Sequence, residues 1–264
     1  MSNAANLLER YGPWALVTGA SDGIGRAFAT ELAAAGLSVV LVARRKEVLD
    51  ELALALHAQH GVQTAVVATD LSTADGRGKV TDVTESLSVG LLVAAAGFGT
   101  SGSFLDTAPE DEARMLDLNC GAVLALTHEY AARFAERGRG GIVLLSSLVA
   151  FQGVPRAANY AATKAYVQTL AEGLQRELGP QDIDVLACAP GPVKSGFAAV
   201  ADMQMGTAVS PETVARGALR ALGRRTTVRP GLQSKFLTLT LSTLPRALRV
   251  RAMERVMGGF TAHQ

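Results

Sequence analysis

The sequence predicts an α/β protein with one doubly wound parallel sheet, helices on both faces of that sheet, and a helical tail at the C-terminus. Short, nearly continuous apolar runs alternate repeatedly with longer segments of helical spacing. Continuous apolar runs are typical of strands that are buried on both faces of a parallel sheet. Repeated strand–helix units favour right-handed crossovers, and these produce a doubly wound sheet.

The elements follow in order along the chain. The expected strands are residues 14–20, 37–44, 64–70, 90–97, 141–147 and 183–191. The expected helices between them are residues 23–36, 45–61, 111–137 and 159–179, several of which end at a glycine, the usual C-terminal stop. Beyond about Ser210 we expect a helix over 211–225 and a last strand over 226–231. With no linker or internal repeat, we expect one domain over 1–264, with a core at about 10–230 and a tail over 231–264.

Composition excludes several classes of protein. At 264 residues and 48% hydrophobic, the chain can bury a large core, and its net charge of +1 gives no electrostatic reason to bind nucleic acid. Four His and two Cys, Cys120 and Cys188, show no metal-ligand spacing, so we expect no metal site. Without a signal peptide or a run of about 18 apolar residues, we expect a soluble, cytoplasmic protein.

A glycine-rich turn, TGASDGIG, joins the first strand to the first helix. Glycines there allow a tight turn and the close approach of a pyrophosphate to the N–H groups of the helix N-terminus. The spacing G-x-x-x-G-x-G differs from the common G-x-G-x-x-G, and packing alone could explain it. Its position after the first strand favours the phosphate role. The residues expected to bind a dinucleotide here are Gly19, Ser21, Gly23, Ile24 and Gly25.

Tyr160 and Lys164 lie four residues apart in a predicted helix, with Ser147 upstream in LLSSL. Side chains at i and i+4 share one helix face, so the ammonium can lower the pKa of the phenol. A phenol with a lowered pKa can act as an acid or base. Alone, this spacing can arise by chance.

Taken together, the motifs resemble those of the short-chain dehydrogenase/reductase family. TGASDGIG, Asn119, Ser147, Tyr160-x-x-x-Lys164 and Pro190-Gly191-Pro192-Val193 follow one another in the order and spacing of that family, over roughly residues 10–230. The resemblance implies a Rossmann-like domain that binds a nicotinamide cofactor. It also implies hydride transfer between the nicotinamide C4 and a carbonyl or alcohol carbon of a small molecule.

The resemblance implies four catalytic roles. Tyr160 would give a proton to the carbonyl oxygen or take one from the alcohol. Lys164 would hold the nicotinamide ribose and lower the Tyr160 pKa. Ser147 would hydrogen-bond the substrate oxygen, and Asn119 would hold a water that links Lys164 to solvent. Taken singly, Asn119 and Ser147 could equally be helix caps or buried polar residues with structural partners. The nicotinamide pocket would be shaped by Pro190, Gly191 and Val193.

The end of the second strand indicates which cofactor is preferred. An acidic residue there would bind a ribose 2′-hydroxyl, but this chain has Ala43 followed by Arg44 and Arg45. Guanidinium groups suit a 2′-phosphate, so we expect NADP(H) over NAD(H), with Arg44 as the main contact and Ser21 as a helper. The alternative is that both arginines only solvate the start of a helix.

Two further places bear on the adenosine. Asp70 and Leu71 would contact the adenine edge, although Asp is also a common helix N-cap. Where the family often has Asn-Asn-Ala-Gly, this chain has Ala94-Ala95-Ala96-Gly97. The Gly97 turn is kept, and the loss of the amide side chains predicts a weaker grip on the adenosine.

Substrate signals are thinner. Apolar residues near the motifs predict a hydrophobic substrate; they are Phe98, Phe151, Val154 and Phe197, with Met203 and Met205 nearby. The alternative is a lid that packs on itself. A substrate carboxylate could meet Lys194 or Arg156.

The tail and the overall activity leave alternatives open. The tail is apolar and basic, with Arg246, Arg249, Arg251 and Arg255 after Pro245, which divides it. It could pack on the domain, cover a partner subunit, or make peripheral membrane contact. The alternatives to a dehydrogenase/reductase are a non-catalytic NADP-binding sensor and a membrane-associated, lipid-handling reductase. The resemblance also implies a homodimer or homotetramer.

Overall fold

A computed structural model describes residues 3–194, 208–231 and 243–260. Seven strands form one sheet in the order β3-β2-β1-β4-β5-β6-β7, and every neighbouring pair is parallel. The strands are β1 (Trp14–Thr18), β2 (Ser38–Ala43), β3 (Thr64–Ala68), β4 (Val89–Ala94), β5 (Gly140–Leu145), β6 (Ile183–Cys188) and β7 (Thr227–Val228). The strand order reverses between β1 and β4, and in such sheets a ligand binds beyond the carboxyl ends of the strands at this point.

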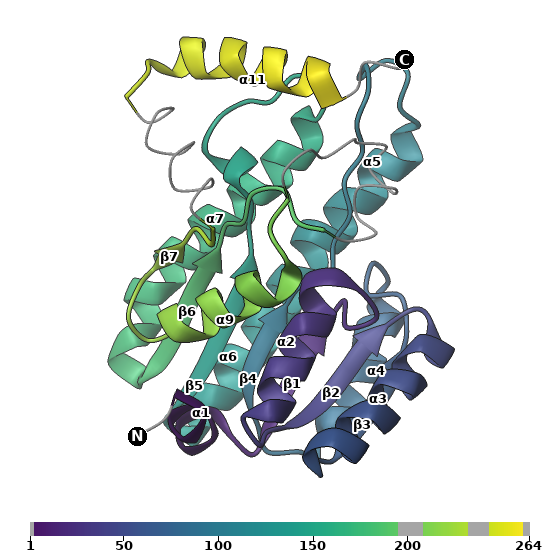
Figure 1. Cartoon of the computed structure of the whole chain (residues 1–264), viewed down its shortest axis with the longest axis vertical. Coiled ribbons are helices and arrows are strands. Elements are labelled where there is room, and N and C mark those ends of the chain that lie inside the picture. Colours follow the sequence, from purple (N-terminus) through teal and green to yellow (C-terminus); the bar gives the residue numbers. More distant parts are fainter. Residues whose placement is uncertain (1–2, 195–207, 232–242, 261–264) are drawn as a thin grey trace.

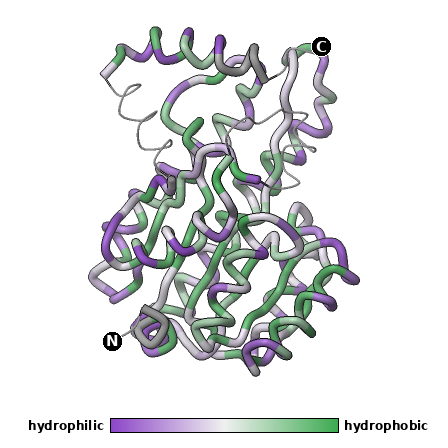
Figure 2. The backbone as a smooth tube through the Cα atoms, viewed as in Figure 1, coloured by the Kyte–Doolittle hydropathy of each residue, from purple (hydrophilic) through white to green (hydrophobic). Residues whose placement is uncertain are grey.

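Helices cover both faces of the sheet (Figure 1). One face packs against α1 (Asn3–Tyr11), α2 (Gly23–Ala34), α3 (Lys46–His60) and α9 (Pro211–Ala221). The other face packs against α4 (Ala74–Thr84), α6 (Val123–Arg137) and α7 (Ala158–Leu178). The remaining elements are α5 (Pro109–Leu116), the π-helix η1 (Asp117–Ala122), the 3-10 helices η2 (Leu148–Phe151) and η3 (Gly179–Gln181), and α11 (Arg246–Phe260). Figure 2 shows the apolar strands in the interior, as the sequence pattern predicts.

All the predicted strands are present, although most end earlier than expected, since the residues after them form the loops of the site. The last one, expected over 226–231, is only two residues long. The helix expected over 111–137 starts at Pro109 and contains the π-helical turn η1.

The sequence did not predict α1 or α4. The sequence of α4, ADGRGKVTDVT, contains two glycines, which lower helix propensity. The structure shows why Gly76 is there, because a Cβ at this position would collide with the carbonyl oxygen of Asp70. Thr73 caps the helix, since its side chain accepts a hydrogen bond of 3.0 Å from the Gly76 N–H.

The last helix, α11, lies beyond the carboxyl ends of the strands, across the N-terminal end of α7 (Figure 1). It begins directly after Pro245, where the sequence predicts the break. Met253 is only 5% exposed and packs in a cluster with Val154, Ala157 and Ala161. The described part of the tail therefore packs on the domain itself, which is the first of the three alternatives, and the alternative of a membrane contact is not supported. Among the described helices, none has both the length and the apolar character needed to span a membrane.

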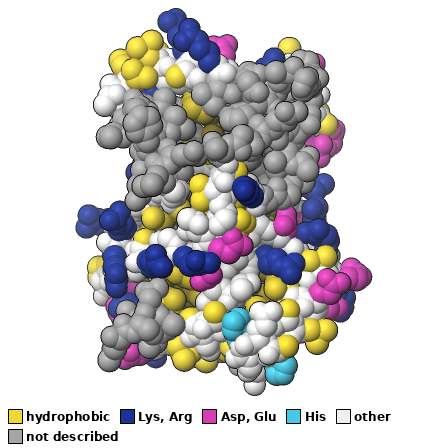
Figure 3. Space-filling model, viewed as in Figure 1, with side chains coloured by type: hydrophobic (Ala, Val, Ile, Leu, Met, Phe, Trp, Pro, Cys, Tyr) yellow, Lys and Arg dark blue, Asp and Glu magenta, His cyan; other side chains and the backbone are white. Residues whose placement is uncertain are grey.

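Charged side chains of both signs lie on the face of the molecule drawn in Figure 3. On the face drawn in Figure 3, Lys and Arg side chains are interrupted by acidic, apolar and uncharged ones. This distribution agrees with the formal net charge of +1.

Candidate active site

The residues singled out from the sequence meet beyond the carboxyl ends of four adjacent strands. The glycine turn follows β1, Gly97 and Phe98 follow β4, Ser147 follows β5, and Pro190 follows β6. The first turns of α7 add Tyr160 and Lys164. Parallel strands end at one edge, and this topology therefore brings together segments that are far apart in sequence.

Ser147 and Tyr160 are joined directly through their side chains by a hydrogen bond. Ser147 has an extended backbone and caps η2, where its Oγ accepts a 3.4 Å hydrogen bond from the Val149 N–H. Burial raises the pKa of Tyr160 to about 12, while the hydrogen bond with Ser147 acts in the opposite direction. The phenol is therefore a proton donor at neutral pH.

Lys164 lies one turn of α7 after Tyr160 and is 7% exposed. Its Nζ donates a 2.8 Å hydrogen bond to the Leu145 carbonyl and lies 5.8 Å from the centre of the Tyr160 ring. Burial lowers the pKa of Lys164 to about 8, with a weaker opposing effect of Cys120. An ammonium carries three N–H groups, and Leu145 O is the one acceptor assigned to it among the described residues.

The expected lowering of the Tyr160 pKa by Lys164 is not found in the protein alone. A lysine that loses its proton at about pH 8 is neutral before a phenol with a pKa of about 12 ionises. It then has no charge with which to stabilise the phenolate. The loss of solvent around the buried phenol therefore decides the direction in which the pKa of Tyr160 shifts.

Asn119 is fully buried in η1, and its side chain holds the loop after β4. Its Oδ1 accepts from the Phe98 N–H at 3.1 Å, while its Nδ2 donates to Phe98 O at 2.8 Å and to Thr163 Oγ1 at 3.1 Å. Both amide N–H groups are thus used by the protein. A water link to Lys164 stays a prediction, and it would have to use an oxygen of Asn119.

The glycine turn has the shape of an anion-binding loop. Gly19 and Gly23 have φ values of +69° and +53°, which favour glycine, and a Cβ on Gly25 would collide with the Gly19 carbonyl. The N-cap residue of α2, Asp22, makes no side-chain capping hydrogen bond, and the first turn contains no acidic residue. The N–H groups at the start of α2 therefore suit a phosphate. Ile24 packs against the core beneath the turn.

The alanines after β4 are held by another residue. The Oγ1 of Thr18 accepts hydrogen bonds of 3.0 Å from the N–H groups of both Ala95 and Ala96. A Cβ on Gly97 would lie 2.8 Å from Asn119 Oδ1 and 3.5 Å from Lys164 Nζ, so only glycine fits there. This end of β4 is therefore ordered by Thr18 and Asn119, without amide side chains at 94 and 95.

On the side expected to hold the adenosine, Arg45 contacts the turn. Its Nη2 donates to Ser21 Oγ at 3.1 Å, and both Arg44 and Arg45 are exposed. Asp70 accepts from the Ser72 N–H at 3.0 Å and from Ser72 Oγ at 2.8 Å, so it forms a turn before α4 and is not its N-cap. Leu71 is 4% exposed and belongs to the core.

Arg114 lies near Asp70 and was not singled out from the sequence. The backbone hydrogen bond from Ser72 holds the pKa of Asp70 below its usual value, and the positive charges of Arg44 and Arg114 act in the same direction. Arg114 also lies 5.3 Å from the centre of the Phe98 ring. It comes from α5, and no motif marks it.

The segment after β6 connects to η2. Pro190 O accepts a 3.0 Å hydrogen bond from the Leu148 N–H, which fixes it beside Ser147. Val193 is 7% exposed and forms a parallel bridge with Val209, while Gly191 lies between them and Pro190. The expected nicotinamide pocket thus borders the residue that hydrogen-bonds Tyr160.

The residues expected to line the substrate pocket have different surroundings. Val154 is 1% exposed and packs against Met253, with Tyr160 and Val149 partly buried beside them. Phe151 is partly buried, and the Arg229 guanidinium lies 4.4 Å from the centre of its ring. Phe197, Met203 and Met205 lie outside the described residues.

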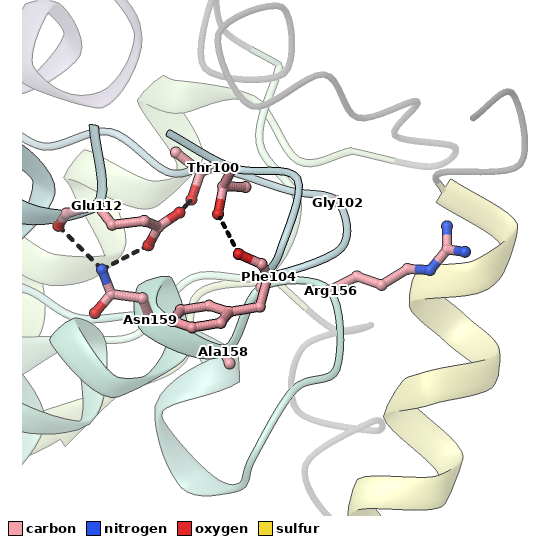
Figure 4. A pocket seen from close by; sticks show the side chains of 9 residues that line it. Thr100, Gly102, Phe104, Glu112, Arg156, Ala158 and Asn159 are labelled. Atoms are coloured by element: carbon pink, nitrogen blue, oxygen red, sulfur yellow. Dashed lines mark hydrogen bonds between the residues drawn. The ribbon is translucent and has the colours of Figure 1, made fainter. Parts of the chain in front are cut away.

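Two cations were expected to meet a substrate carboxylate, and they are placed differently. Lys194 is exposed next to the bridge with Val209. Arg156 has a left-handed backbone with φ 65°, and its side chain points toward α11 (Figure 4). Within residues 3–194, 208–231 and 243–260, no three His, Cys, Asp or Glu side chains are grouped to hold a metal ion.

Comparison with known proteins agrees with this geometry. The short chain dehydrogenase family matches residues 13–205. A 7beta-hydroxysteroid dehydrogenase of Clostridium sardiniense is 37% identical over 186 residues, which are 70% of this chain and 71% of that protein.

Solved structures resemble the whole fold. One from work on 7beta-hydroxysteroid dehydrogenase stereoselectivity has a TM-score of 0.87 and 29% identity, and the match covers 94% of this chain and 98% of the other. A short-chain dehydrogenase from Sphingobium yanoikuyae in complex with NADPH has a TM-score of 0.79 and 30% identity, covering 88% and 94%. The chain therefore belongs to the short chain dehydrogenase family, and it is an oxidoreductase that transfers hydride between a nicotinamide cofactor and a carbonyl or alcohol group.

Proposed function

We propose that this enzyme reduces a bulky, hydrophobic ketone with NADPH, and that Tyr160 is the proton donor. The observation that supports this most directly is the side-chain hydrogen bond between Ser147 and Tyr160, with the Lys164 ammonium buried behind the phenol. A donor, a partner for the substrate oxygen and a cation for the ribose then converge at the carboxyl ends of β5 and β6.

Each side chain has a separate task in the reaction. A reduced nicotinamide, when bound, would supply the hydride for the carbonyl carbon. Tyr160 gives the proton of its hydroxyl to the carbonyl oxygen, and Ser147 donates a hydrogen bond to the same oxygen as negative charge develops on it. Lys164 would hold the nicotinamide ribose with the N–H groups that do not bind Leu145. Tyr160 regains its proton from solvent.

The raised pKa of the phenol supports the reduction direction. With its pKa raised to about 12 by burial, Tyr160 is protonated at neutral pH and ready to donate. Oxidation of an alcohol would require the phenolate, which burial disfavours. We therefore place ketone reduction ahead of alcohol oxidation at neutral pH.

The preference for NADP(H) rests on the residues at the end of β2. Arg45 contacts Ser21 at the glycine turn, and Arg44 is exposed beside it. Both guanidinium groups suit a 2′-phosphate. A related structure that binds NADPH supports the same choice. The test compares kcat/KM for NADPH and NADH, and equal values would contradict the preference.

The substrate class rests on the apolar cover over Tyr160 and on the relatives. Met253 and Val154, with Val149, give the phenol an apolar neighbourhood. Two matches concern 7beta-hydroxysteroid dehydrogenase, whose substrates are steroids. We therefore propose secondary alcohols and ketones of fused-ring, steroid-like molecules. In a panel of steroid, fatty acyl and small aliphatic ketones with NADPH, steroid ketones should give the highest kcat/KM.

The catalytic assignment is tested with two tyrosines on one helix. Tyr160→Phe removes the proton donor and should lower kcat by about 10³-fold, while NADPH binding is retained. Tyr166→Phe is the matched control, since this tyrosine is 38% exposed on the same helix, and its activity should equal that of the wild type. Full turnover by Tyr160→Phe would overturn the assignment.

The alternatives are not favoured. A sensor without turnover would have no use for the joined Ser147 and Tyr160 side chains, and the related proteins named above are dehydrogenases. A membrane-associated reductase is not favoured because α11 packs on the domain. The homo-oligomer and the cytoplasmic location stay predictions. For the former, Leu124 is an exposed apolar residue on α6, one of the helices expected to pair.

A further inference from the structure

Outside the catalytic group, a cluster of polar side chains joins three segments that carry the site. Glu112 is partly buried in α5, Thr100 lies in the loop after β4, and Asn159 lies in the first turn of α7, directly before Tyr160. Figure 4 shows the side chains of Thr100 and Asn159 converging on the Glu112 carboxylate.

The carboxylate uses both oxygens in short hydrogen bonds. Oε1 accepts from Thr100 Oγ1 at 2.6 Å, and Oε2 accepts from Asn159 Nδ2 at 2.7 Å. The same Nδ2 donates to the Glu112 backbone carbonyl at 3.0 Å. Hydrogen bonds to an ionised acceptor are shorter and stronger than neutral ones, so this is a firm connection.

The start of α7 depends on this connection. Its N-cap residue, Ala157, has no side chain that could cap the helix, and no side-chain capping bond is made. Uncapped helix ends fray unless other contacts hold them. Asn159 supplies such a contact one residue before Tyr160. The negative charge of Glu112 also lies in the first turn of α5, where the helix dipole favours it.

A second attachment lies one turn further along α7. Thr163 Oγ1 accepts a hydrogen bond from Asn119 in η1, and Asn159 and Thr163 are four residues apart on one face of α7. Tyr160 and Lys164 lie on the neighbouring stripe, because successive helix residues are turned by about 100°. The hydrogen bonds of Asn159 and Thr163 hold one face of α7 and fix the rotation of the helix about its axis. They therefore also fix the direction in which Tyr160 and Lys164 point.

We propose that Glu112 and Asn159 are positioning residues, which together set the direction in which Tyr160 presents its hydroxyl to the substrate. The inference rests on the proposed role of Tyr160 as proton donor. Neither residue touches the reacting atoms. They act through the orientation of α7, and a misplacement of about 1 Å can lower a rate by about 10²-fold.

The test exchanges the two functional groups of the pair. Asn159→Asp places a carboxylate against Glu112, and we expect kcat to fall by about 30-fold. Glu112→Gln alone should change kcat by less than about threefold, since its amide can turn its oxygen to Asn159 and its N–H groups to the Thr100 hydroxyl. The double variant Glu112→Gln/Asn159→Asp restores the side-chain amide–carboxylate pair in reverse but not the bond to the Glu112 carbonyl, so it should recover kcat in part, to within about tenfold of the wild type.

Two controls separate positioning from loss of structure. Glu110→Gln changes an exposed carboxylate in the same helix turn and should leave kcat unchanged. Affinity for the adenosine half of the cofactor, measured with 2′,5′-ADP, should be unchanged in Asn159→Asp, because the glycine turn and Arg45 lie outside α7. A parallel loss of kcat and 2′,5′-ADP affinity would indicate general damage to the fold and would overturn the positioning role.

The remaining outcomes are also decisive. If Asn159→Asp keeps kcat within about twofold of the wild type while Tyr160→Phe is inactive, the positioning role is refuted and the proposed function stands. A double variant no better than Asn159→Asp likewise refutes it. Turnover by Tyr160→Phe would instead remove the proposed function on which the inference rests.

Discussion

The two sides of the active site are held in very different ways. On the sheet side, Lys164, Asn119 and the end of β4 are each fixed by hydrogen bonds between elements that are far apart in sequence. On the opposite side, α11 packs on the domain through a small apolar cluster around Met253, without joining the sheet. We call the hydrogen-bonded sheet edge with Lys164 and Asn119 the catalytic side, and α11 with Met253 the cover.

This difference assigns two tasks to two regions. Proton transfer needs side chains that are held in one geometry, and the sheet edge provides it. Choice of substrate needs an apolar wall of adaptable shape, and a methionine on a separate helix suits this. Changes on the sheet side should therefore act on kcat, and changes on the cover should act on KM.

After Tyr160→Phe, the largest effect is expected for Ser147→Ala. Loss of its hydrogen bond to the developing oxyanion should lower kcat by about 10²–10³-fold and change KM little. Steady-state kinetics with NADPH and a responsive ketone measures the change, and Ser103→Ala, at an exposed loop position, is the control. An unchanged kcat would show that the sheet side does not carry the chemistry.

The second prediction concerns pH. Burial lowers the pKa of Lys164 to about 8 and raises that of Tyr160 to about 12. Of these two groups, therefore, only the lysine titrates between pH 7 and 10. Its charge is present below pH 8 and is lost above it. We expect kcat/KM for ketone reduction to fall by up to about tenfold per pH unit above pH 8. A flat profile from pH 6 to 10 would contradict this role of Lys164.

Arg45→Ala should have a smaller effect, restricted to the cofactor. Removal of its guanidinium should raise KM for NADPH by about tenfold and leave KM for NADH nearly unchanged. Arg44→Ala is the natural comparison, because Arg44 makes no contact with Ser21 among the described residues. If Arg44→Ala has the larger effect, the expectation from the sequence is right and the emphasis on Arg45 is wrong.

The smallest effect on catalysis is expected for Met253→Ala, on the cover. Loss of the buried thioether should loosen α11, raise KM for bulky ketones about threefold to fivefold, and leave kcat for a small ketone unchanged. Limited proteolysis between residues 243 and 260 should become faster. A fall in kcat for small and bulky ketones alike would remove the distinction between catalytic side and cover.

The features of the fold and the site that depend on local sequence patterns could be predicted. The strands follow from continuous apolar runs, and Tyr160, Lys164 and the glycine turn follow from short motifs at fixed spacing. The break at Pro245 was also predicted, since proline interrupts a helix wherever it stands in the interior.

The contacts between distant segments could not be predicted. Thr18 opens the TGASDGIG motif, but the motif does not show that its side chain orders the end of β4, and Met253 is one of several apolar residues in its tail. Which partner each side chain meets is decided by the packing of the sheet and its helices. Burial likewise reversed the expected direction of the Tyr160 pKa, because the sequence shows the neighbouring charge but not the loss of solvent.

The π-helical turn at Asp117–Ala122 gives this site a requirement on the number of residues as well as on their identity. Such a turn accommodates an additional residue within a continuous helix, and each residue changes the helical phase by about 100°. Deletion of Leu118 would keep every family motif in order, but it would turn α5, with Glu112, relative to Asn119. The two could then no longer face the same stripe of α7, and a comparison of motifs alone would still count the site as intact.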